Sequence, residues 1–409
     1  MKQTLRILTF ALFFLLLASK ALQAQDDSIN PAGVSSDMSS TTSSGLSFNK
    51  ALFSSRDEVY ALEGLVSRLS STAPNALINA LSPLSMKDAS TQKQVLSSLL
   101  PSGGSNELLT SVLGISNIEN KIIDSNMYSF YRSLKDKELQ AFPRTYNIYL
   151  QPIFRNATKD TQAGISGFSS NSYGITLGFN KRFTSGMIFG SLLAYTRTEL
   201  ANTNGLNNTL MLDSYSLKLY TLREFKRIFF QAILGYSLHD AYTTRDITFL
   251  NQYITSNRLA NQLDATLKLG YSILGFMPYV SLNYLALIES PYNEKGGFGA
   301  LSVDANFTQS LSLNLGSTYK YSIKHFTFGL LGEIGYDTLA DRVSNSARFI
   351  NTNLVFTSQT LERPSFGFNT GANIKFSFLK TSSLFLEYIF SVKSDYRANY
   401  LGLKYLLRF

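Results

Sequence analysis

The chain has 409 residues, no Cys, no Trp and only two His, and its charged fraction of 16% is low for a soluble protein. The missing Cys and scarce His exclude a disulfide framework, a cysteine nucleophile and zinc sites that need several such ligands, and nothing suggests a cofactor. The formal charge of +9 falls to +6 without Lys2, Arg6 and Lys20 of the first 24 residues; this is a mild excess without a dense Lys/Arg stripe, so we expect no nucleic-acid partner.

Residues 1–24 have the layout of a secretory signal peptide. Lys2 and Arg6 precede a short apolar run, LTFALFFLLLA, and small and polar residues follow it. The run is too short for a comfortable membrane-spanning helix. Cleavage could follow Ala24 or Ala21, and an uncleaved anchor is the alternative. We therefore expect export through the secretory translocon.

Residues 25–47 and 48–143 differ in composition. The first segment is rich in Ser, Thr and Gly and predicts a flexible tether, because it holds too little apolar surface to fold alone. The second has helical spacing, as in Val59, Leu62 and Leu65, and is punctuated by Pro74 and later prolines. It predicts a helical linker, although a small helical bundle fits the same pattern.

The last helical stretch of this linker, near residues 117–137, is amphipathic. Its apolar side includes Ile118, Ile122, Met127 and Phe130, and charged residues surround the remainder. A helix of this kind can face a mixed polar and apolar interior.

From 144 to 409 the periodicity changes from helical to two. Leu311, Leu313 and Leu315 alternate with polar Ser312 and Asn314, and similar runs recur to the end of the chain. A soluble sandwich would also alternate, but its polar face would carry more charge. The pattern favours an all-β membrane barrel with lipid outside and a polar lumen.

About twelve antiparallel strands can be placed in this region, an even number as in most bacterial single-chain barrels. The predicted strands are 144–154, 171–183, 186–197, 210–222, 227–240, 258–272, 276–289, 309–322, 325–337, 364–378, 382–393 and 396–409. Short connections alternate with long ones at 155–170, 198–209, 241–257, 290–308 and 338–363. We assign the short ones to the periplasm and the long ones to outer loops; only the tight turn at 394–395 breaks the rule.

Residues 144–409 resemble the C-terminal β-domain of autotransporters. The segments that carry the resemblance are LGYSLHDAYTTRDI, MPYVSLNYLALIESPYNEKG, ALSVDANFTQSLSLNLGSTYKY and the terminal SDYRANYLGLKYLLRF. The resemblance implies a twelve-stranded barrel in the Gram-negative outer membrane, a helix inside its lumen, and transport of an N-terminal passenger to the cell surface. It makes residues 117–137 the expected pore helix.

The N-terminal region departs from this family. No β-helix repeats precede the pore helix, so we expect a passenger that is very short or missing. Adjacent Asn residues used for self-cleavage in some family members are absent from the pore-helix segment, where Asn120 and Asn126 are isolated. We predict no autocleavage.

The terminal strand carries an expected assembly signal. Leu403, Tyr405, Leu407 and Phe409 alternate along one face of the last residues. They could be ordinary lipid-facing side chains. The resemblance implies in addition that they are recognised by the barrel-assembly machinery.

No catalytic constellation is visible. The two histidines, His239 and His325, lie on different predicted strands, and there is no G-x-S-x-G motif. We interpret His239 as a residue at the loop end of a strand, and Asp213, Asp264 and Glu333 as lumen charges. The chain is therefore not expected to be an enzyme.

The sequence leaves three functional hypotheses. The first is an outer-membrane autotransporter-type barrel that displays a short N-terminal segment. The others are a porin-like channel, which requires the helix to leave the lumen, and an adhesin that binds through its long outer loops. We expect a monomeric barrel with outer-membrane lipid as its surroundings.

Overall fold

A computed structural model describes residues 75–99, 105–133, 145–161, 167–203, 208–340, 344–350, 355–359, 366–379, 381–393 and 395–409. The chain divides into two compact units, Met1–Ser43 and Ser44–Phe409, and every described residue belongs to the second. The expected signal peptide, the tether and the predicted helix near Val59 lie outside the described residues.

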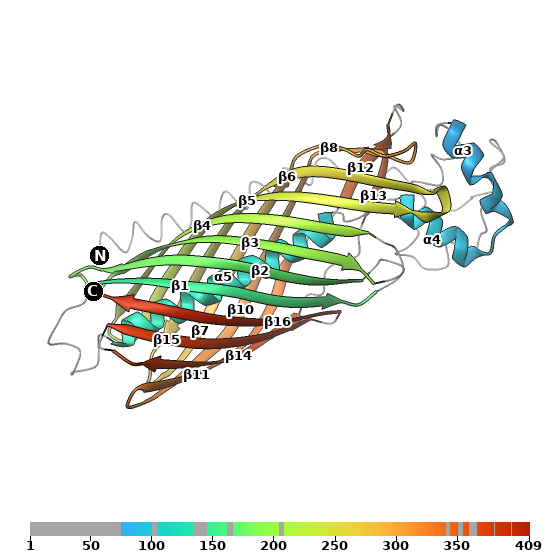
Figure 1. The fold of residues 1–409 in the computed structure, drawn as a ribbon. Coiled ribbons are helices and arrows are strands. Elements are labelled where there is room, and N and C mark those ends of the chain that lie inside the picture. Colours follow the sequence, from blue (N-terminus) through green and yellow to red (C-terminus); the bar gives the residue numbers. More distant parts are fainter. Residues whose placement is uncertain are drawn as a thin grey trace. The chain divides into compact units, whose positions relative to one another are not determined.

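Twelve long strands close into an antiparallel barrel in which the last strand, β16, pairs with the first, β1 (Figure 1). The barrel strands are β1 (Tyr146–Lys159), β2 (Phe168–Arg182), β3 (Ile188–Asn202), β4 (Thr209–Phe225), β5 (Ile228–Ile247), β6 (Gln252–Tyr271), β7 (Phe276–Glu289), β10 (Asn306–Ile323), β11 (Phe326–Ala340), β14 (Phe366–Ser377), β15 (Ser382–Lys393) and β16 (Tyr396–Arg408). The predicted all-β barrel of about twelve strands is confirmed.

The alternation places apolar side chains outside. On β2, Ile175, Leu177 and Phe179 are exposed, whereas Thr176 and Asn180 are buried in the lumen. A closed barrel satisfies all strand hydrogen bonds internally, which lipid requires because it offers no partners of its own. The apolar positions of the alternation thus face the lipid, and the polar positions face the lumen.

The two ends of the barrel differ in their connections. At one end the strands are joined by short turns, such as Lys226–Arg227 between β4 and β5. The chain reaches β1 and leaves β16 at this same end, as in outer-membrane barrels whose short turns are periplasmic. We call it the periplasmic end and the opposite one the outer end.

The long connections are more ordered than the sequence indicated. The predicted loop 241–257 is mostly the extension of β5 and β6, each of 20 residues, joined by η4 (Thr248–Leu250) and Asn251. Charged residues such as Arg245 resemble loop residues in the sequence, but the structure buries Arg245 against partners from other segments. The loop prediction was therefore wrong at this hairpin.

The predicted loops 290–308 and 338–363 also contain strands. They form a four-stranded antiparallel sheet at the outer end, in the order β13-β12-β9-β8. Its strands are β8 (Tyr292–Asn293), β9 (Leu301–Val303), β12 (Ser344–Phe349) and β13 (Phe356–Gln359). We call it the outer sheet.

Within the described residues ahead of the barrel, four helical segments occur: α3 (Asn75–Leu81), η2 (Ser82–Met86), α4 (Ala89–Leu99) and α5 (Ser105–Ser133). Helix α5 begins twelve residues before the predicted pore helix, because Leu108, Leu109, Val112 and Ile115 continue its apolar side. Its predicted end, at 134–137, lies outside the described residues. Of the helices that are described, none combines the length and apolar character needed to cross a bilayer.

Candidate functional site in the barrel lumen

Helix α5 runs along the inside of the barrel, from the outer end to the periplasmic end (Figure 1). Asn120 Nδ2 donates a hydrogen bond to Thr266 Oγ1 on β6 at 3.1 Å, and Lys404 Nζ on β16 donates to Ser125 Oγ at 2.6 Å. The lumen therefore holds a helix that contacts strands on different sides of the barrel.

Lys218 on β4 binds the middle of the helix. Its Nζ lies 2.8 Å from Asp264 Oδ1 on β6 and 3.3 Å from Glu119 Oε2 on α5. It also donates hydrogen bonds to Ser116 Oγ and Asn120 Oδ1, both at 2.9 Å. All three charged side chains are buried, so the two carboxylates depend on this one ammonium group.

Two more buried ion pairs join the helix to the barrel. Lys121 Nζ lies 2.5 Å from Glu333 Oε2 on β11, and Tyr279 OH on β7 donates to the same oxygen at 2.7 Å. Asp124 pairs with Lys268 on β6. Because a buried charge without a partner is costly, these pairs favour one depth and one rotation of α5 in the lumen.

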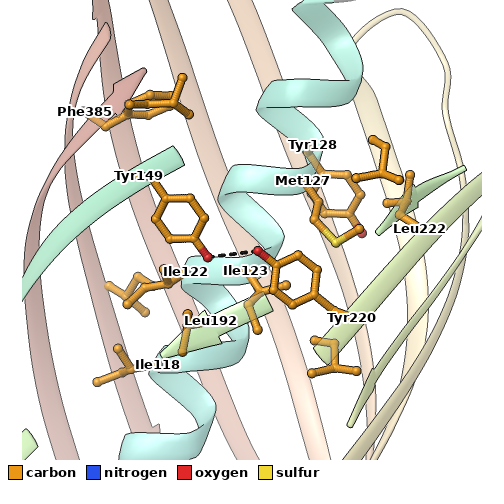
Figure 2. Packing of buried hydrophobic residues seen from close by; sticks show 14 of the residues in the cluster. Ile118, Ile122, Ile123, Met127, Tyr128, Tyr149, Leu192, Tyr220, Leu222 and Phe385 are labelled. Carbon is orange, nitrogen blue, oxygen red and sulfur yellow. Dashed lines mark hydrogen bonds between the residues drawn. The ribbon is translucent and has the colours of Figure 1, made fainter. Parts of the chain in front are cut away.

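In the periplasmic half of the lumen, around Ile118–Tyr128, apolar and aromatic side chains of the helix and the strands form one buried cluster (Figure 2). The predicted pore-helix residues Ile118, Ile122 and Met127 lie in one buried cluster with side chains of the surrounding strands. Phe130 belongs to α5, but its side chain is outside the described part of the structure. The barrel members of this cluster are Tyr149, Ile153, Ile188, Leu192, Ala194, Tyr220, Leu222, Phe229, Ile233, Met277, Tyr279, Phe385, Ile389, Tyr400 and Leu406.

Two tyrosines close this half beside the helix. The hydroxyl groups of Tyr149 on β1 and Tyr220 on β4 are hydrogen-bonded at 3.1 Å, and Figure 2 shows their rings next to Ile122 and Ile123. The hydrogen bond pairs two buried hydroxyl groups, and Tyr220 OH also lies 3.4 Å from the Ser191 carbonyl oxygen. Both rings belong to the same buried cluster as Ile122 and Ile123 of the helix.

The outer half of the lumen, around residues 105–117, is filled on one side only. Leu108, Leu109, Val112 and Ile115 pack against apolar side chains of β2 to β7. On the other side a cavity of about 170 Å³ remains, lined by polar and apolar residues of β1, β6, β7 and the later strands and by helix residues between 110 and 121. The outer half therefore resembles a vestibule above the filled periplasmic half.

Helices α3 and α4 pack on the outer sheet at the outer end. Leu81, Leu96 and Leu99 share an apolar cluster with Phe349 of β12 and Phe356 of β13. We call this unit of α3, η2, α4 and the outer sheet the outer cap. Its apolar core shows that residues 75–99 are folded against the barrel unit.

A buried arginine joins the outer cap to the barrel. Arg245 Nη1 on β5 donates to the Ser98 carbonyl of α4 at 2.7 Å, and Nη2 donates to the Gly299 carbonyl at 2.9 Å and pairs with Glu294. Nearby, burial raises the pKa of Tyr292 to about 12, with Arg258 lowering it in part.

The terminal strand places its predicted residues outside. Leu403, Tyr405, Leu407 and Phe409 are all exposed on the outward face of the barrel end. The Phe409 ring stacks on Tyr146 of β1 with centroids 5.9 Å apart, and the two residues exchange backbone hydrogen bonds of 3.1 Å. These residues thus lie at the seam where the barrel closes.

Two interpretations of single residues were wrong. Asp213 lies on the outward face of β4, where Arg197 Nη2 is 2.7 Å away, whereas Asp264 and Glu333 are lumen charges as expected. His239 lies inside β5 and is buried, with Ser214 Oγ at 2.8 Å from Nδ1, because β5 continues beyond the predicted strand end.

The lumen partners of the helix include three lysines whose individual contacts the sequence analysis did not identify. Lys218, Lys268 and Lys404 stand on the polar face of alternating strands, so alternation places them in the lumen. Their pairing with Glu119 and Asp124 required the three-dimensional arrangement. Among the described residues, no group of three or more His, Cys, Asp or Glu side chains could hold a metal ion.

A family model, described as the autotransporter β-domain, matches residues 148–389. A curated relative, an extracellular serine protease of Serratia marcescens, is 23% identical over 244 residues, which are 57% of this chain and 23% of that protein. The chain therefore spans less than a quarter of the length of the curated relatives it matches.

Solved structures with a similar fold include autotransporter domains. The translocator domain of NalP from Neisseria meningitidis is 13% identical, with a TM-score of 0.55, and the match covers 71% of this chain and 98% of that one. The β-domain of Bordetella BrkA is also 13% identical, with a TM-score of 0.48, covering 65% of this chain and 100% of that one. At such low identity the first likeness speaks for the fold alone.

Proposed function

Because this chain belongs to the autotransporter β-domain family, we propose that its barrel carries the segment ahead of α5 across the outer membrane and presents it at the cell surface. The barrel itself is an outer-membrane autotransporter barrel of the Gram-negative type, and such a barrel is a transport domain. The proposal adds that transport runs outward and that the transported segment is the one ahead of α5.

The observation that carries the proposal is the path of the chain through the lumen. Helix α5 enters at the outer end and leaves at the periplasmic end, and α3 and α4 pack on the outer sheet. A segment ahead of α4 would therefore start from the outer side of the membrane. The cap residues are the last part of that segment before the pore helix.

Labelling of single cysteines on intact cells tests this direction. The native chain has no Cys, so Met86→Cys in η2 (91% exposed) supplies the only thiol. We expect a membrane-impermeant maleimide to label it in intact cells. A matched control, Leu274→Cys (95% exposed) in the β6–β7 turn, should react only after the outer membrane is permeabilised.

The opposite pattern would overturn the proposal. If Met86→Cys reacts only in permeabilised cells, the cap faces the periplasm and no segment has been carried outward. If both sites react in intact cells, the integrity of the membrane has failed; a periplasmic marker enzyme measured in the supernatant identifies that case, and the labelling is then repeated on intact cells.

We further propose that Ile118, Ile122, Met127 and Phe130 hold the helix in place as a plug of the periplasmic half. Support comes from the first three, which are buried among barrel side chains. A cysteine pair at Asn120 and Thr266 should crosslink, because their side chains are hydrogen-bonded at 3.1 Å. In the control pair, the second cysteine stands at the outward-facing neighbour Leu267 and not at Thr266. If the two pairs crosslink equally, the plug proposal is contradicted.

We also propose that the terminal residues Leu403, Tyr405, Leu407 and Phe409 are the signal read by the barrel-assembly machinery, after export through the secretory translocon. All four are exposed and outward-facing. Deleting Phe409, or Phe409→Asp, should lower the yield of heat-modifiable barrel in the outer membrane, whereas Phe409→Tyr should be tolerated.

A separate variant distinguishes recognition from closure of the seam. Tyr146→Leu removes the ring that stacks on Phe409 but keeps the terminal aromatic residue. If Tyr146→Leu lowers the yield as much as Phe409→Asp, the terminal residue acts through the seam and the recognition proposal fails.

We infer that the chain has no enzymatic role of its own. The matched curated relatives are named as serine proteases, but the region of this chain that the family model matches is a transport domain. Incubating the purified barrel with a general protease substrate should release no product above that of a heat-denatured sample.

A further inference from the structure

The periplasmic ends of β2 to β5 carry an excess of positive charge. Residues 180–190 and 222–232 contain the cations Lys181, Arg182, Arg223, Lys226 and Arg227, and Glu224 is the single carboxylate among them. These strands are neighbours in the barrel, so the charges gather on one sector of the periplasmic rim. Four of them, Lys181, Arg223, Lys226 and Arg227, form what we call the basic collar.

The basic collar points away from the lumen. On β2, Lys181 follows the exposed positions Leu177 and Phe179 in the alternation; on β4, Arg223 precedes exposed Phe225. Lys226 and Arg227 form the exposed turn between β4 and β5. The same alternation turns Glu224 toward the lumen side, away from Arg223 and Phe225.

Aromatic rings lie directly beside the collar. Lys181 Nζ is 5.3 Å from the centroid of Tyr146 and 5.1 Å from that of Phe183, and the Arg223 guanidinium carbon is 4.3 Å from that of Phe225. Aromatic residues of barrels mark the level of the lipid headgroups. The collar cations are therefore held at headgroup depth, next to the apolar band.

Cations at the outer end are arranged differently. Arg197 pairs with Asp213, and Lys393 Nζ lies 2.8 Å from Asp337 Oδ2. Within the described part of the chain, none of the four collar cations has such a carboxylate partner. An anion from outside the protein is the complement that this sector lacks.

We propose that the basic collar binds the phosphate headgroups of anionic phospholipids in the periplasmic leaflet of the outer membrane. Lys and Arg near an anionic lipid surface each strengthen binding about fivefold. The rings beside them contact the upper acyl chains, so an ordered anionic lipid can meet charge and apolar surface at once. This site lies outside the lumen and does not depend on passenger transport.

The chain has no Trp, so the fluorescence of one introduced Trp reports on its surroundings without background from other indoles. Phe183→Trp (39% exposed) places a single indole beside the collar, and Phe276→Trp (47% exposed) places one in a sector whose turn, Ser272–Gly275, has no charge. We call these variants the collar reporter and the control reporter. The full chain with either reporter is reconstituted in phosphatidylcholine vesicles that hold a minor fraction of brominated phosphatidylglycerol.

We expect brominated phosphatidylglycerol to quench the collar reporter at least about fivefold more efficiently than the same fraction of brominated phosphatidylcholine does. The control reporter should be quenched equally by both lipids. Replacing all four collar residues by Gln should abolish the difference. A variant in which the collar lysines become arginines and the collar arginines become lysines should keep the difference in quenching between the two lipids. High salt should reduce this difference.

Three results would overturn the proposal. The first is equal quenching of the collar reporter by the two brominated lipids. The second is a preference for brominated phosphatidylglycerol at the control reporter as large as that at the collar reporter. The third is a preference that survives the four Gln substitutions in a barrel that is still heat-modifiable. If the lipid preference is absent but the Gln variant assembles poorly with purified assembly machinery, the collar serves an acidic protein partner instead.

Discussion

The two halves of the lumen hold the same helix in different ways. In the periplasmic half, Ile122 and Met127 are enclosed by strands on several sides, and Tyr149 and Tyr220 close the remaining space. In the outer half, α5 packs on β2 to β7 and leaves a cavity of about 170 Å³ on its other side, which reaches along the helix as far as Lys121. A helix can block a barrel by packing tightly at one depth, so the cavity in the outer half does not conflict with a plug in the periplasmic half.

The difference also separates two kinds of interaction. Apolar packing dominates the periplasmic half, while buried ion pairs along the helix, from Lys218–Glu119 to Lys268–Asp124, set its position. Buried ion pairs add little net stability but are costly to break, so they favour one arrangement over others. Packing and ions can be tested apart.

The largest effect is expected from Lys218→Met. It removes the ammonium group between Glu119 and Asp264 and leaves both carboxylates buried. We expect the free energy of unfolding to fall by about 3–5 kcal/mol, measured from the fraction of heat-modifiable barrel against urea. The combined variant Lys218→Met, Glu119→Gln and Asp264→Asn should recover most of this loss.

A loss below about 1 kcal/mol for Lys218→Met would contradict the prediction. Asp264 also borders the cavity, so such a result would mean that water from the outer half reaches and solvates these charges.

A pair of truncations compares the halves directly. Ile122→Ala should lower the free energy of unfolding by about 2–5 kcal/mol, because the enclosed site cannot fill the space that it leaves. Leu113→Ala, on the cavity side of the same helix, should cost only about 1 kcal/mol or less, since it removes a half-buried side chain. Equal costs in the same urea assay would show that the halves are packed alike.

Substitutions of two glycines by Ala compare the two halves by adding a methyl group where the truncations removed side-chain atoms. A Cβ on Gly178 of β2 would lie 1.9 Å from Tyr149 Cζ, a buried ring held by Tyr220. Gly178→Ala should therefore cost about 1–3 kcal/mol of unfolding free energy.

A Cβ on Gly114, in the outer half, would meet the flexible end of Arg155, which borders the cavity and can move into it. Gly114→Ala should be close to neutral, because the better helix propensity of Ala, about 1 kcal/mol, offsets the movement. A larger loss for Gly114→Ala than for Gly178→Ala would reverse the comparison.

The smallest effect is expected outside both halves. Arg397 and Asp160 form an exposed ion pair at the outer rim, with Nη2 to Oδ1 at 3.4 Å. Arg397→Gln should change the free energy of unfolding by less than about 0.5 kcal/mol, as exposed pairs usually do. A loss comparable to that of Lys218→Met would show that the rim, and not the lumen, holds the barrel together.

The sequence alone determined the barrel. Alternation of apolar and polar residues from 144 onward predicted every membrane strand, because lipid on one face and a polar lumen on the other impose a period of two that is local in the chain. The amphipathic pattern likewise predicted a helix near residues 117–137, which the resemblance to autotransporters placed in the lumen, although α5 begins earlier than expected.

The tertiary structure alone decided the partners and the outer end. Arg245 has the character of a loop residue until Glu294 and the Ser98 carbonyl come beside it, and Glu119 has no visible partner until β4 brings Lys218 to it. Each of these contacts joins residues far apart in the chain. A period read along one strand can say which face a side chain occupies, but which side chain lies opposite depends on the closure of the barrel around the helix.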